Sequence, residues 1–361
     1  MIYSNTIRVL FVSRSTLFSS QGGDTIQLTK TAEFLRKLNV EVEIRLAGND
    51  CSIAGFSAIH IFNMIRPADG MKYFRSAKIP IFLSPIYVDY SFFERKFGKN
   101  LVFRMLSRDL REYIKTIARS IVNKEQISDF RYLLYGHHRS VQLLCRKAFM
   151  LLPNSVSEYH RLSRDYDVSV PYRVIPNAID PHLFSNKIQP DTEYAGAVIC
   201  VARIEQRKNQ LNLIYALNDA PYKVFIIGKC SPNHQWYLNQ CKSAAASNIY
   251  FVDHLNHEQL PSIYAAARVH ALPSWFETTG LCSLEAAMMG CSIVVTDKGD
   301  QIEYFSGHAH FCDPEDIASI RRAVDLAYAS PLDQAFQELL RNKYTWQNAA
   351  SETLEAYKMA L

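Results

Sequence analysis

The sequence predicts an α/β protein of two domains, each built on a parallel β-sheet that helices cover on both faces. The length of 361 residues exceeds what one hydrophobic core usually serves. Short apolar runs of strand length alternate with segments of helical apolar spacing, which is typical of parallel sheets. This alternation stops near residue 188 and then restarts. We therefore expect domains at 1–188 and 189–345, with a last helix at about 346–361 packing back on the first domain.

The first domain begins with a strand, a polar loop and a helix. Ile7–Ser13 is an apolar run, and helical spacing follows the loop that contains Gly22 and Gly23. Two adjacent glycines let a ligand approach backbone N–H groups closely, although a plain turn before a helix is the alternative. The dinucleotide fingerprint G-x-G-x-x-G is absent. Further strands are expected at 42–46, 58–62, 80–84, 149–152 and 172–175, with a helix at 156–164.

A basic region lies inside this domain. Residues 91–122 are expected to form one long helix or two helices with apolar stripes. The stretch 91–150 holds thirteen Lys/Arg and five Asp/Glu, so its excess is 13 − 5 = +8, whereas the whole chain is +5. Two interpretations stay open, a core-packing segment with a solvated basic face and a basic amphipathic segment that contacts an anionic membrane. No nucleic-acid-binding motif accompanies the charge, so nucleic acid is not expected.

The second domain repeats the alternation after a polar linker at 185–193. Strands are expected at 197–201, 222–227, 248–252, 269–272, 293–295 and 309–313. Helices are expected at 209–217, 235–246, 258–266, 317–328, 331–342 and from 346 through 357. This order predicts a second parallel sheet covered on both faces.

Composition excludes several classes of protein. Hydrophobic content of 48% and charge of 21% are those of a globular protein. No apolar run reaches the ~18 residues of a membrane span, and the N-terminus lacks a signal-peptide pattern, so we expect a cytoplasmic protein. The eight cysteines, among them Cys51, form no C-x-x-C pair, which indicates reduced thiols rather than a disulfide framework or a zinc site. We expect no metal and no cofactor.

One stretch carries the clearest chemical signal. Residues 273–299 read as strand end, polar loop, helix, turn and buried strand. The start of such a helix presents unpaired N–H groups that favour phosphate. Glu277 lies in the loop and Glu285 inside the helix, and a carboxylate can accept hydrogen bonds from two neighbouring hydroxyls of a sugar or ribose. An anion site beside two diol-binding carboxylates suggests a nucleotide sugar.

The spacing Glu-x7-Glu of Glu277 and Glu285 stands inside Ser-x-x-Glu-x-x-Gly-Leu-x-x-Leu-Glu-Ala-x-x-x-Gly. This motif resembles the donor site of retaining glycosyltransferases of glycosyltransferase family 4, which have the GT-B fold of two Rossmann-like domains facing across a cleft. The segment from Arg203 to Asn209 resembles the Gly-Arg-Leu…Lys-Gly segment of that family, with Ala202 and Asn209 in place of the glycines. The turn at 176–180 resembles the family's Pro-Asn-Gly-Val-Asp turn between its domains.

The resemblance implies a role for each matching residue. Arg203 and Lys208 would bind the donor diphosphate, with Arg207 as the substitute for Lys208 in a different helix register, and a planar fork and a mobile point charge both suit phosphate. Glu285 would bind the ribose and Glu277 the transferred sugar. The remaining donor-binding residues that the resemblance implies are Gly22, Gly23, Leu255, Thr278, Thr279, Gly280 and Leu281.

The family's histidine after the fourth strand of the first domain has no counterpart here. Asp89 and Tyr87 are the nearest polar residues, and Asp89 is either a catalytic or acceptor-binding group or a helix cap. The departure leaves the acceptor side of the site open.

The resemblance implies metal-independent transfer of a sugar, with retention, from a nucleoside-diphosphate sugar to a glycan or lipid-linked acceptor. Use in polysaccharide or lipopolysaccharide biosynthesis, at the inner face of the membrane, would suit the basic region. The alternatives are a non-catalytic nucleotide-sugar-binding subunit and a disaccharide synthase or phosphorylase on the same fold.

Overall fold

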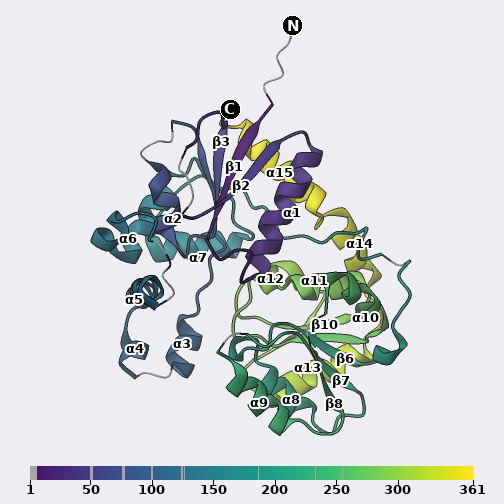
Figure 1. The fold of residues 1–361 in the computed structure, drawn as a ribbon. Coiled ribbons are helices and arrows are strands. Elements are labelled where there is room, and N and C mark those ends of the chain that lie inside the picture. Colours follow the sequence, from purple (N-terminus) through teal and green to yellow (C-terminus); the bar gives the residue numbers. More distant parts are fainter. Residues whose placement is uncertain are drawn as a thin grey trace. The chain divides into compact units, whose positions relative to one another are not determined.

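The computed structural model describes residues 6–48, 52–74, 78–98, 101–122, 125, 127–185, 187–231, 233–253 and 255–361. The chain divides into two compact units, Met1–Asn177 with Trp346–Leu361, and Ala178–Thr345 (Figure 1). Each unit is an α/β layer structure with its own sheet. Within the described ranges, no helix combines the length and the apolar character needed to cross a bilayer.

The first unit contains a five-stranded parallel sheet. Its order is β2-β1-β3-β4-β5, and β1 pairs with β2 in the register Arg8↔Glu41 to Ser13↔Leu46. The strands are β1 (Arg8–Ser13), β2 (Glu41–Leu46), β3 (Ala58–Phe62), β4 (Ile81–Ser84) and β5 (Met150–Leu151). The helices are α1 (Gly23–Lys37), α2 (Pro67–Met71), η1 (Lys72–Phe74), α3 (Ser91–Phe97), α4 (Leu101–Met105), α5 (Arg108–Val122), α6 (Arg131–Lys147), α7 (Val156–Tyr166) and α15 (Trp346–Lys358).

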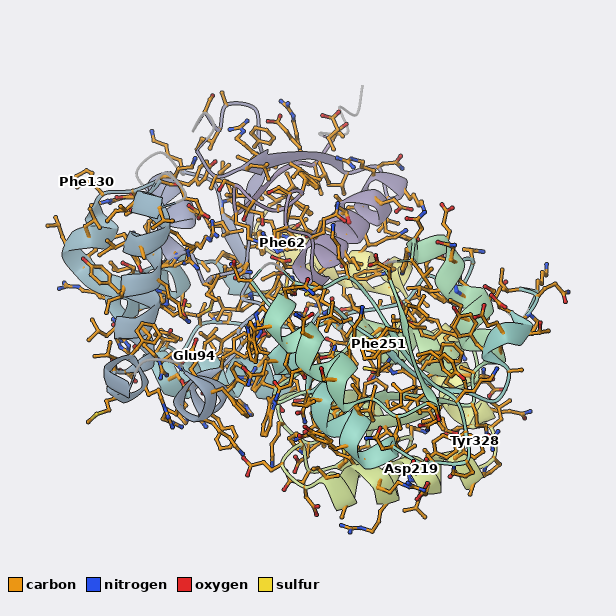
Figure 2. The ribbon with its side chains drawn as sticks, turned by 60° about the horizontal axis from the view of Figure 1, so that its bottom comes forward. Phe62, Glu94, Phe130, Asp219, Phe251 and Tyr328 are labelled. Atoms are coloured by element: carbon orange, nitrogen blue, oxygen red, sulfur yellow. The ribbon has the colours of Figure 1, made fainter. Side chains whose placement is uncertain are left out.

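Helices cover both faces of this sheet, as its apolar strands require. On one face, Leu10 and Val12 of β1 share a core with Val141 and Leu144 of α6 and with Leu162 of α7. On the opposite face, the last helix of the chain is fixed by polar and aromatic contacts. His60 Nδ1 lies 2.7 Å from the hydroxyl of Tyr357, and the rings of Phe82 and Tyr357 meet edge to face. Figure 2 shows Phe62, the last residue of β3, inside this unit.

The second unit contains a six-stranded parallel sheet in the order β11-β10-β9-β6-β7-β8. The strands are β6 (Val198–Val201), β7 (Val224–Ile227), β8 (Ile249–Val252), β9 (Val269–Leu272), β10 (Ser292–Thr296) and β11 (His310–Cys312). The helices are η2 (Thr192–Tyr194), η3 (Gln206–Lys208), α8 (Gln210–Leu217), α9 (Gln235–Ala244), η4 (His257–Gln259), α10 (Leu260–Ala266), α11 (Leu281–Met288), α12 (Gln301–Phe305), α13 (Ile317–Ala329) and α14 (Gln334–Asn342).

Two separate cores form on the two faces of this sheet. Val198 and Val224 pack with α8, α9 and α13 on one face. Ile199 and Phe225 point the other way and pack with α10, α11, α12 and α14. Successive strand residues therefore alternate between two buried faces, which is why β6 and β7 are apolar throughout.

The boundary between the units differs from the expected position near 188. Ile179 and Phe184 are buried in the core of the second unit, and Ile179 N donates to Tyr344 O at 2.9 Å. These contacts draw the segment after Asn177 into the second unit. The expected linker at 185–193 belongs to the second unit as well, because the segment from Ala178 onward does.

Two expected elements differ in detail, and one helix was not expected. Residues 172–175 form no strand, because β5 is only two residues long and Tyr172 makes a single bridge with Leu151. The described residues of 91–122 form three helices instead of one or two, and the backbone of Gly98 leaves the helical region after α3. Helix α6 was not expected, and a turn at Gly136 with φ 70° interrupts its periodicity.

Candidate functional site

The candidate site lies at the carboxyl edge of the second sheet, at the point where the order of the strands reverses. From β6 the strands run outward as β6-β7-β8 on one side and as β9-β10-β11 on the other. The loops after β6 and β9 therefore leave the sheet next to each other at the topological switch point. Open α/β sheets bind ligands at such a point.

The loop after β6 carries three cationic side chains around one buried carboxylate. Glu205 is 3% exposed, and its Oε1 lies 3.0 Å from Arg207 Nη2 and 3.7 Å from Arg203 Nη2. Ser231 Oγ donates to Oε2 of the same carboxylate at 3.0 Å. Burial alone would raise the pKa of Glu205, but Arg207, Arg203 and Lys208 outweigh it, and the net pKa is lowered. Glu205 is therefore an ionised anchor for this loop, while the side chain of Arg203 remains 43% exposed.

Lys208 points into the loop after β9. Its Nζ lies 2.5 Å from Glu277 Oε2, and the two side chains are 21% and 14% exposed. Ser274 Oγ donates to the same oxygen at 3.3 Å. Two residues 69 positions apart in the sequence, both expected at the site, are thus brought into direct contact.

The loop that holds Glu277 is fixed by the turn after β10. Glu277 N donates to Lys298 O, and Asp300 N donates to Glu277 O, both at 3.0 Å. Gly299 stands between these bonds with φ +111°, and a Cβ there would meet Glu277 O at 1.9 Å. Only glycine permits this approach of two backbones.

Helix α11 begins at this loop. Gly280 is its N-cap in the left-handed region, with φ 72° and ψ 66°. A Cβ on Gly280 would lie 2.8 Å from Gln301 Nε2. The amide of Gln301 is fully buried, and neither of its polar atoms has a hydrogen-bond partner. Thr279 is buried, whereas Thr278 and Leu281 are half-buried beside it.

Helix α11 is tied to the sheet through a buried histidine. Val201 N donates to His270 Nε2 at 3.4 Å, and the other ring nitrogen lies 3.3 Å from Ser283 Oγ. Burial lowers the pKa of His270 to about 3, so the ring is neutral and Nδ1 carries the proton toward Ser283. Burial raises the pKa of the neighbouring Cys282 thiol to about 12, which excludes a thiolate at this position near neutral pH.

Glu285 lies one turn inside α11 and is 6% exposed. Its Oε1 is 2.8 Å from Nε2 of His257, a half-exposed side chain at the start of η4. The ring of Phe184 meets His257 edge to face at 5.4 Å. Leu255, two residues before His257, packs against the same core. Glu285 and Leu255 are thus linked through one short segment after β8.

The second unit therefore brings together Arg203, Lys208, Glu277, Gly280 and Glu285. Four further residues of the site, Glu205, His257, Ser274 and Gln301, were given no role on the sequence alone. A carboxylate between two arginines is a local signal for Glu205. Ser274 has a signal as well, since it is the first residue of the Ser-x-x-Glu motif and lies three positions before its partner Glu277. His257 and Gln301 carry no signal in the sequence, because they reach the site only when distant loops meet.

The remaining expected residues belong to the first unit. Gly22 is the N-cap of α1 in extended conformation, and Gly23 opens the helix. Asp89 Oδ1 accepts a hydrogen bond from Ser91 N at 2.9 Å, but Asp89 lies one residue before Tyr90, which is the N-cap of α3. Tyr87 is 5% exposed, and its hydroxyl donates to Asp165 at 2.6 Å. Asp89 and Tyr87 thus have structural partners within this unit.

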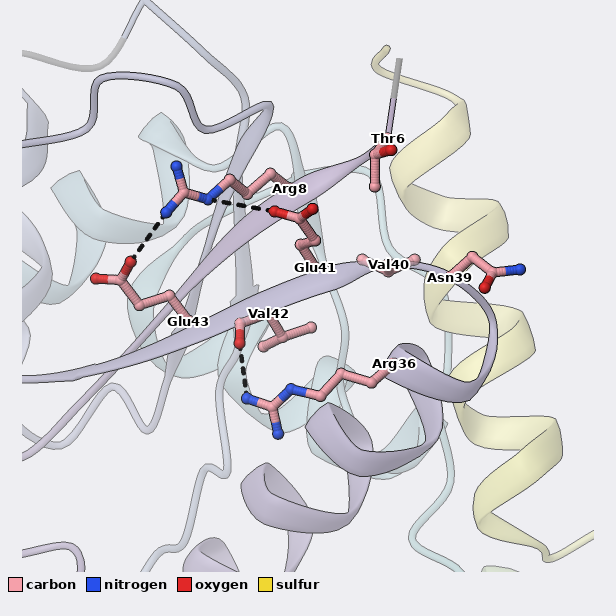
Figure 3. A pocket seen from close by; sticks show the side chains of 8 residues that line it. All are labelled: Thr6, Arg8, Arg36, Asn39, Val40, Glu41, Val42 and Glu43. Carbon is pink, nitrogen blue, oxygen red and sulfur yellow. Dashed lines mark hydrogen bonds and ion pairs between the residues drawn. The ribbon is translucent and has the colours of Figure 1, made fainter. Parts of the chain in front are cut away.

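A hollow of about 810 Å³ lies at the other end of the first sheet (Figure 3). Its charged groups have partners within the hollow, since Arg8 pairs with Glu41 at 3.7 Å and with Glu43 at 3.4 Å, and Arg36 donates to the backbone Val42 O at 2.6 Å. It lies where β1 and β2 begin, and parallel sheets place their ligands at the carboxyl ends of strands. This hollow is therefore a weaker candidate than the switch point of the second sheet.

The described ranges contain no group of three or more His, Cys, Asp or Glu arranged to hold a metal ion. Seven of the eight cysteines lie in those ranges and are free thiols, and Cys51 lies outside them.

Comparison with known sequences gives one family. Residues 185–345 match the family model of glycosyl transferases group 1. Glycogen synthase of Mycobacterium tuberculosis H37Rv is 28% identical over 199 residues, which cover 52% of this chain and 48% of that protein. O-antigen chain mannosyltransferase B of Escherichia coli is 26% identical over 184 residues, or 46% of each chain. The match spans about half the length of these curated relatives.

Comparison with solved structures covers nearly the whole chain. Sucrose-phosphate synthase from Thermosynechococcus elongatus has a TM-score of 0.73 at 14% identity, covering 98% of both chains. Anabaena HepE in complex with UDP and glucose has a TM-score of 0.69 at 16% identity, covering 98% of this chain and 100% of that one. WaaG, a glycosyltransferase involved in lipopolysaccharide biosynthesis, has a TM-score of 0.63 at 15% identity, covering 98% and 99%. The predicted α/β fold of the GT-B class is confirmed.

Proposed function

We propose, from the match of residues 185–345 to glycosyl transferases group 1, that this chain transfers a sugar from a nucleoside-diphosphate sugar to an acceptor hydroxyl. Retention of configuration and independence from metal are part of the proposal. They rest on the resemblance of the segment from Glu277 to Glu285 to family 4 donor sites. Cationic side chains and a helix start supply, in this proposal, the charge that a metal would otherwise bring.

The observation that carries the proposal is the ion pair between Lys208 and Glu277 at the switch point. It places a cation from the loop after β6 and a carboxylate from the loop after β9 beside the start of α11. A diphosphate that binds Lys208 and Arg203 would therefore lie next to the N–H groups of that helix. Glu277 would then stand beside the sugar carried by the diphosphate.

The reaction breaks the bond between the anomeric carbon and the oxygen of the β-phosphate. Negative charge then develops on the departing diphosphate. Arg203, Lys208 and the start of α11 would stabilise that charge in the transition state more than in the bound donor, which is the requirement for catalysis. Glu285 would hold the ribose diol, with Leu255 near the base.

We propose a glycan or lipid-linked acceptor. The mannosyltransferase that acts on O-antigen chains and the structure of WaaG from lipopolysaccharide biosynthesis support this class. For the donor, the HepE complex with UDP and glucose makes a uridine nucleotide the first to test.

The test is calorimetric titration of the full chain with UDP, GDP, ADP and dTDP, with a divalent metal and with a chelator. Arg203→Ala and Glu285→Ala should each weaken binding of one nucleotide by about ten-fold or more, as expected for loss of a charge-assisted hydrogen bond. Arg322→Ala is the matched control, because Arg322 lies on α13 and its side chain is 67% exposed.

Binding that survives both site variants, or that requires the metal, would contradict the donor site as proposed. Donor binding without transfer or hydrolysis would instead favour a non-catalytic subunit. That alternative is motivated by Pro85 to Tyr90, where the family histidine has no counterpart.

A further inference from the structure

Helix α5 exposes apolar side chains and buries a charged one, the reverse of an ordinary amphipathic helix. Arg111 is 1% exposed and pairs with Glu94 of α3 at 3.0 Å. In contrast, Leu110, Ile114 and Ile121 are 43%, 39% and 73% exposed. Positions i, i+4 and i+11 share one helical face. The apolar stripe of α5 thus faces outward, while the helix uses charged groups to contact its neighbour.

This stripe adjoins exposed apolar side chains at the start of α6, because α5 and α6 pack on each other and Tyr113 of α5 donates to Leu133 O at 2.9 Å. Ten of the 23 exposed large hydrophobic residues in the described part of the chain fall within 92–135. We define the outer helical surface by Leu110, Ile114, Ile121, Val122, Phe130 and Leu134. Figure 1 shows α3 to α6 gathered on one side of the first unit, and Figure 2 shows Phe130 at its outer edge. Soluble surfaces rarely expose so many apolar side chains together unless they bind something.

The charge around this surface is positive. All five carboxylates of 91–150 are engaged in ion pairs with basic side chains, including Glu112 with Lys115 and Glu125 with Arg66. Basic groups stand beside exposed rings: Lys96 Nζ lies 6.0 Å from the ring of Phe92, and the Arg139 guanidinium lies 5.3 Å from the ring of Tyr135. Lys99 and Lys124 lie outside the described residues.

We propose that the outer helical surface docks on an anionic lipid bilayer. Exposed apolar side chains would enter the boundary between headgroups and acyl chains, and the neighbouring lysines and arginines would pair with lipid phosphates. A second copy of the chain fits less well, because a two-fold contact would bring two positively charged segments together. The docking does not depend on the donor site, since it uses other residues of the other unit.

The test is co-sedimentation of the full chain with vesicles of phosphatidylcholine alone and with one third phosphatidylglycerol. Wild type should bind the anionic vesicles and lose most of that binding at high salt. Ile121→Glu and Leu134→Glu should each reduce partitioning by about ten-fold at either salt concentration. Lys96→Gln and Arg139→Gln should each reduce it by about five-fold at low salt, since each cation near an anionic surface adds about that factor.

Leu326→Glu is the matched apolar control, because Leu326 is 60% exposed on α13 of the second unit. Arg322→Gln is the matched charge control. Circular dichroism and nucleotide titration of every variant should equal wild type, which separates this proposal from the donor assignment. Equal binding to both vesicle types, unchanged binding of Ile121→Glu, or a dimer in sedimentation equilibrium that Ile121→Glu dissociates would each overturn it.

Discussion

Replacing Gly299 by alanine tests how the candidate site is built. The backbone at Gly299 has φ +111°, which L side chains rarely adopt, and the added Cβ would lie 1.9 Å from Glu277 O. The backbone conformation costs about 1–2 kcal/mol for a residue with a Cβ. Relief of the clash adds about 1–3 kcal/mol, the range typical of overpacking. We therefore expect the second unit to lose about 2–5 kcal/mol of unfolding free energy.

Gly307→Ala is the control that separates these two effects. Gly307 also has positive φ, at +81°, but a Cβ there would meet nothing within 4 Å. Gly307→Ala should lower the unfolding free energy only by the cost of the backbone conformation, about 1–2 kcal/mol. For a unit of this size, each kcal/mol lowers the melting temperature by about 2–4 °C. Thermal unfolding followed by circular dichroism measures both variants.

Nucleoside-diphosphate binding should differ between Gly299→Ala and Gly307→Ala in the same way as stability does. Moving the backbone of Glu277 also moves its carboxylate away from Lys208. We expect Gly299→Ala to weaken nucleoside-diphosphate binding by about ten-fold or more, equivalent to ~1.4 kcal/mol, and Gly307→Ala to leave it unchanged. Equal stability and equal affinity for the two variants would show that the approach of Gly299 to Glu277 does not build the site.

Two further predictions concern single side chains. Lys208→Met should weaken binding of a nucleoside diphosphate by about ten- to one-hundred-fold and binding of the monophosphate by less. Arg207→Met should have a smaller effect, because the Arg207 side chain pairs with Glu205. A larger effect of Arg207→Met in calorimetric titration would assign the phosphate contact to Arg207. His60 is fully buried, and burial lowers its pKa to about 3. Below pH ~6.5 the unfolded chain therefore takes up a proton on this histidine that the folded chain does not. The free energy of unfolding decreases as the pH is lowered from about 6.5 to 3. Urea unfolding should show that lowering the pH from 7.5 to 5.5 costs about 1.4 kcal/mol through this residue, and that His60→Gln removes this loss; an unchanged pH dependence in the variant would contradict it.

The sheet strands could be predicted because their signal is local. Both faces of each sheet are covered, so strands such as Val224–Ile227 are continuous apolar runs whose ends the sequence marks. Tyr172–Ile175 is apolar except for Arg173 but forms no strand, because its partner β5 offers only two residues. Periodicity alone does not reveal the length of a partner strand. It also does not reveal that the apolar stripe of α5 faces outward.

The site was predictable in two loops and not beyond them. Arg203 to Lys208 and Glu277 to Glu285 are each continuous in the sequence, and their charges and glycines mark them. Asn209 stands where the family pattern has glycine. It adopts φ 60° and ψ 30°, a conformation that asparagine shares with glycine, so this replacement is tolerated. His257 and Gln301 reach the site from separate loops, and only the folded sheet brings them there.

The contact between His60 and Tyr357 joins residues 297 positions apart. Its consequence concerns the order of synthesis. The ribosome completes the whole second unit, from Ala178 to Thr345, before it makes the helix that covers one face of the first sheet. The second unit is thus an insertion that can close early, and its entry and exit are already paired through Ile179 and Thr345. The first unit therefore cannot complete its fold until the whole second unit has been synthesised.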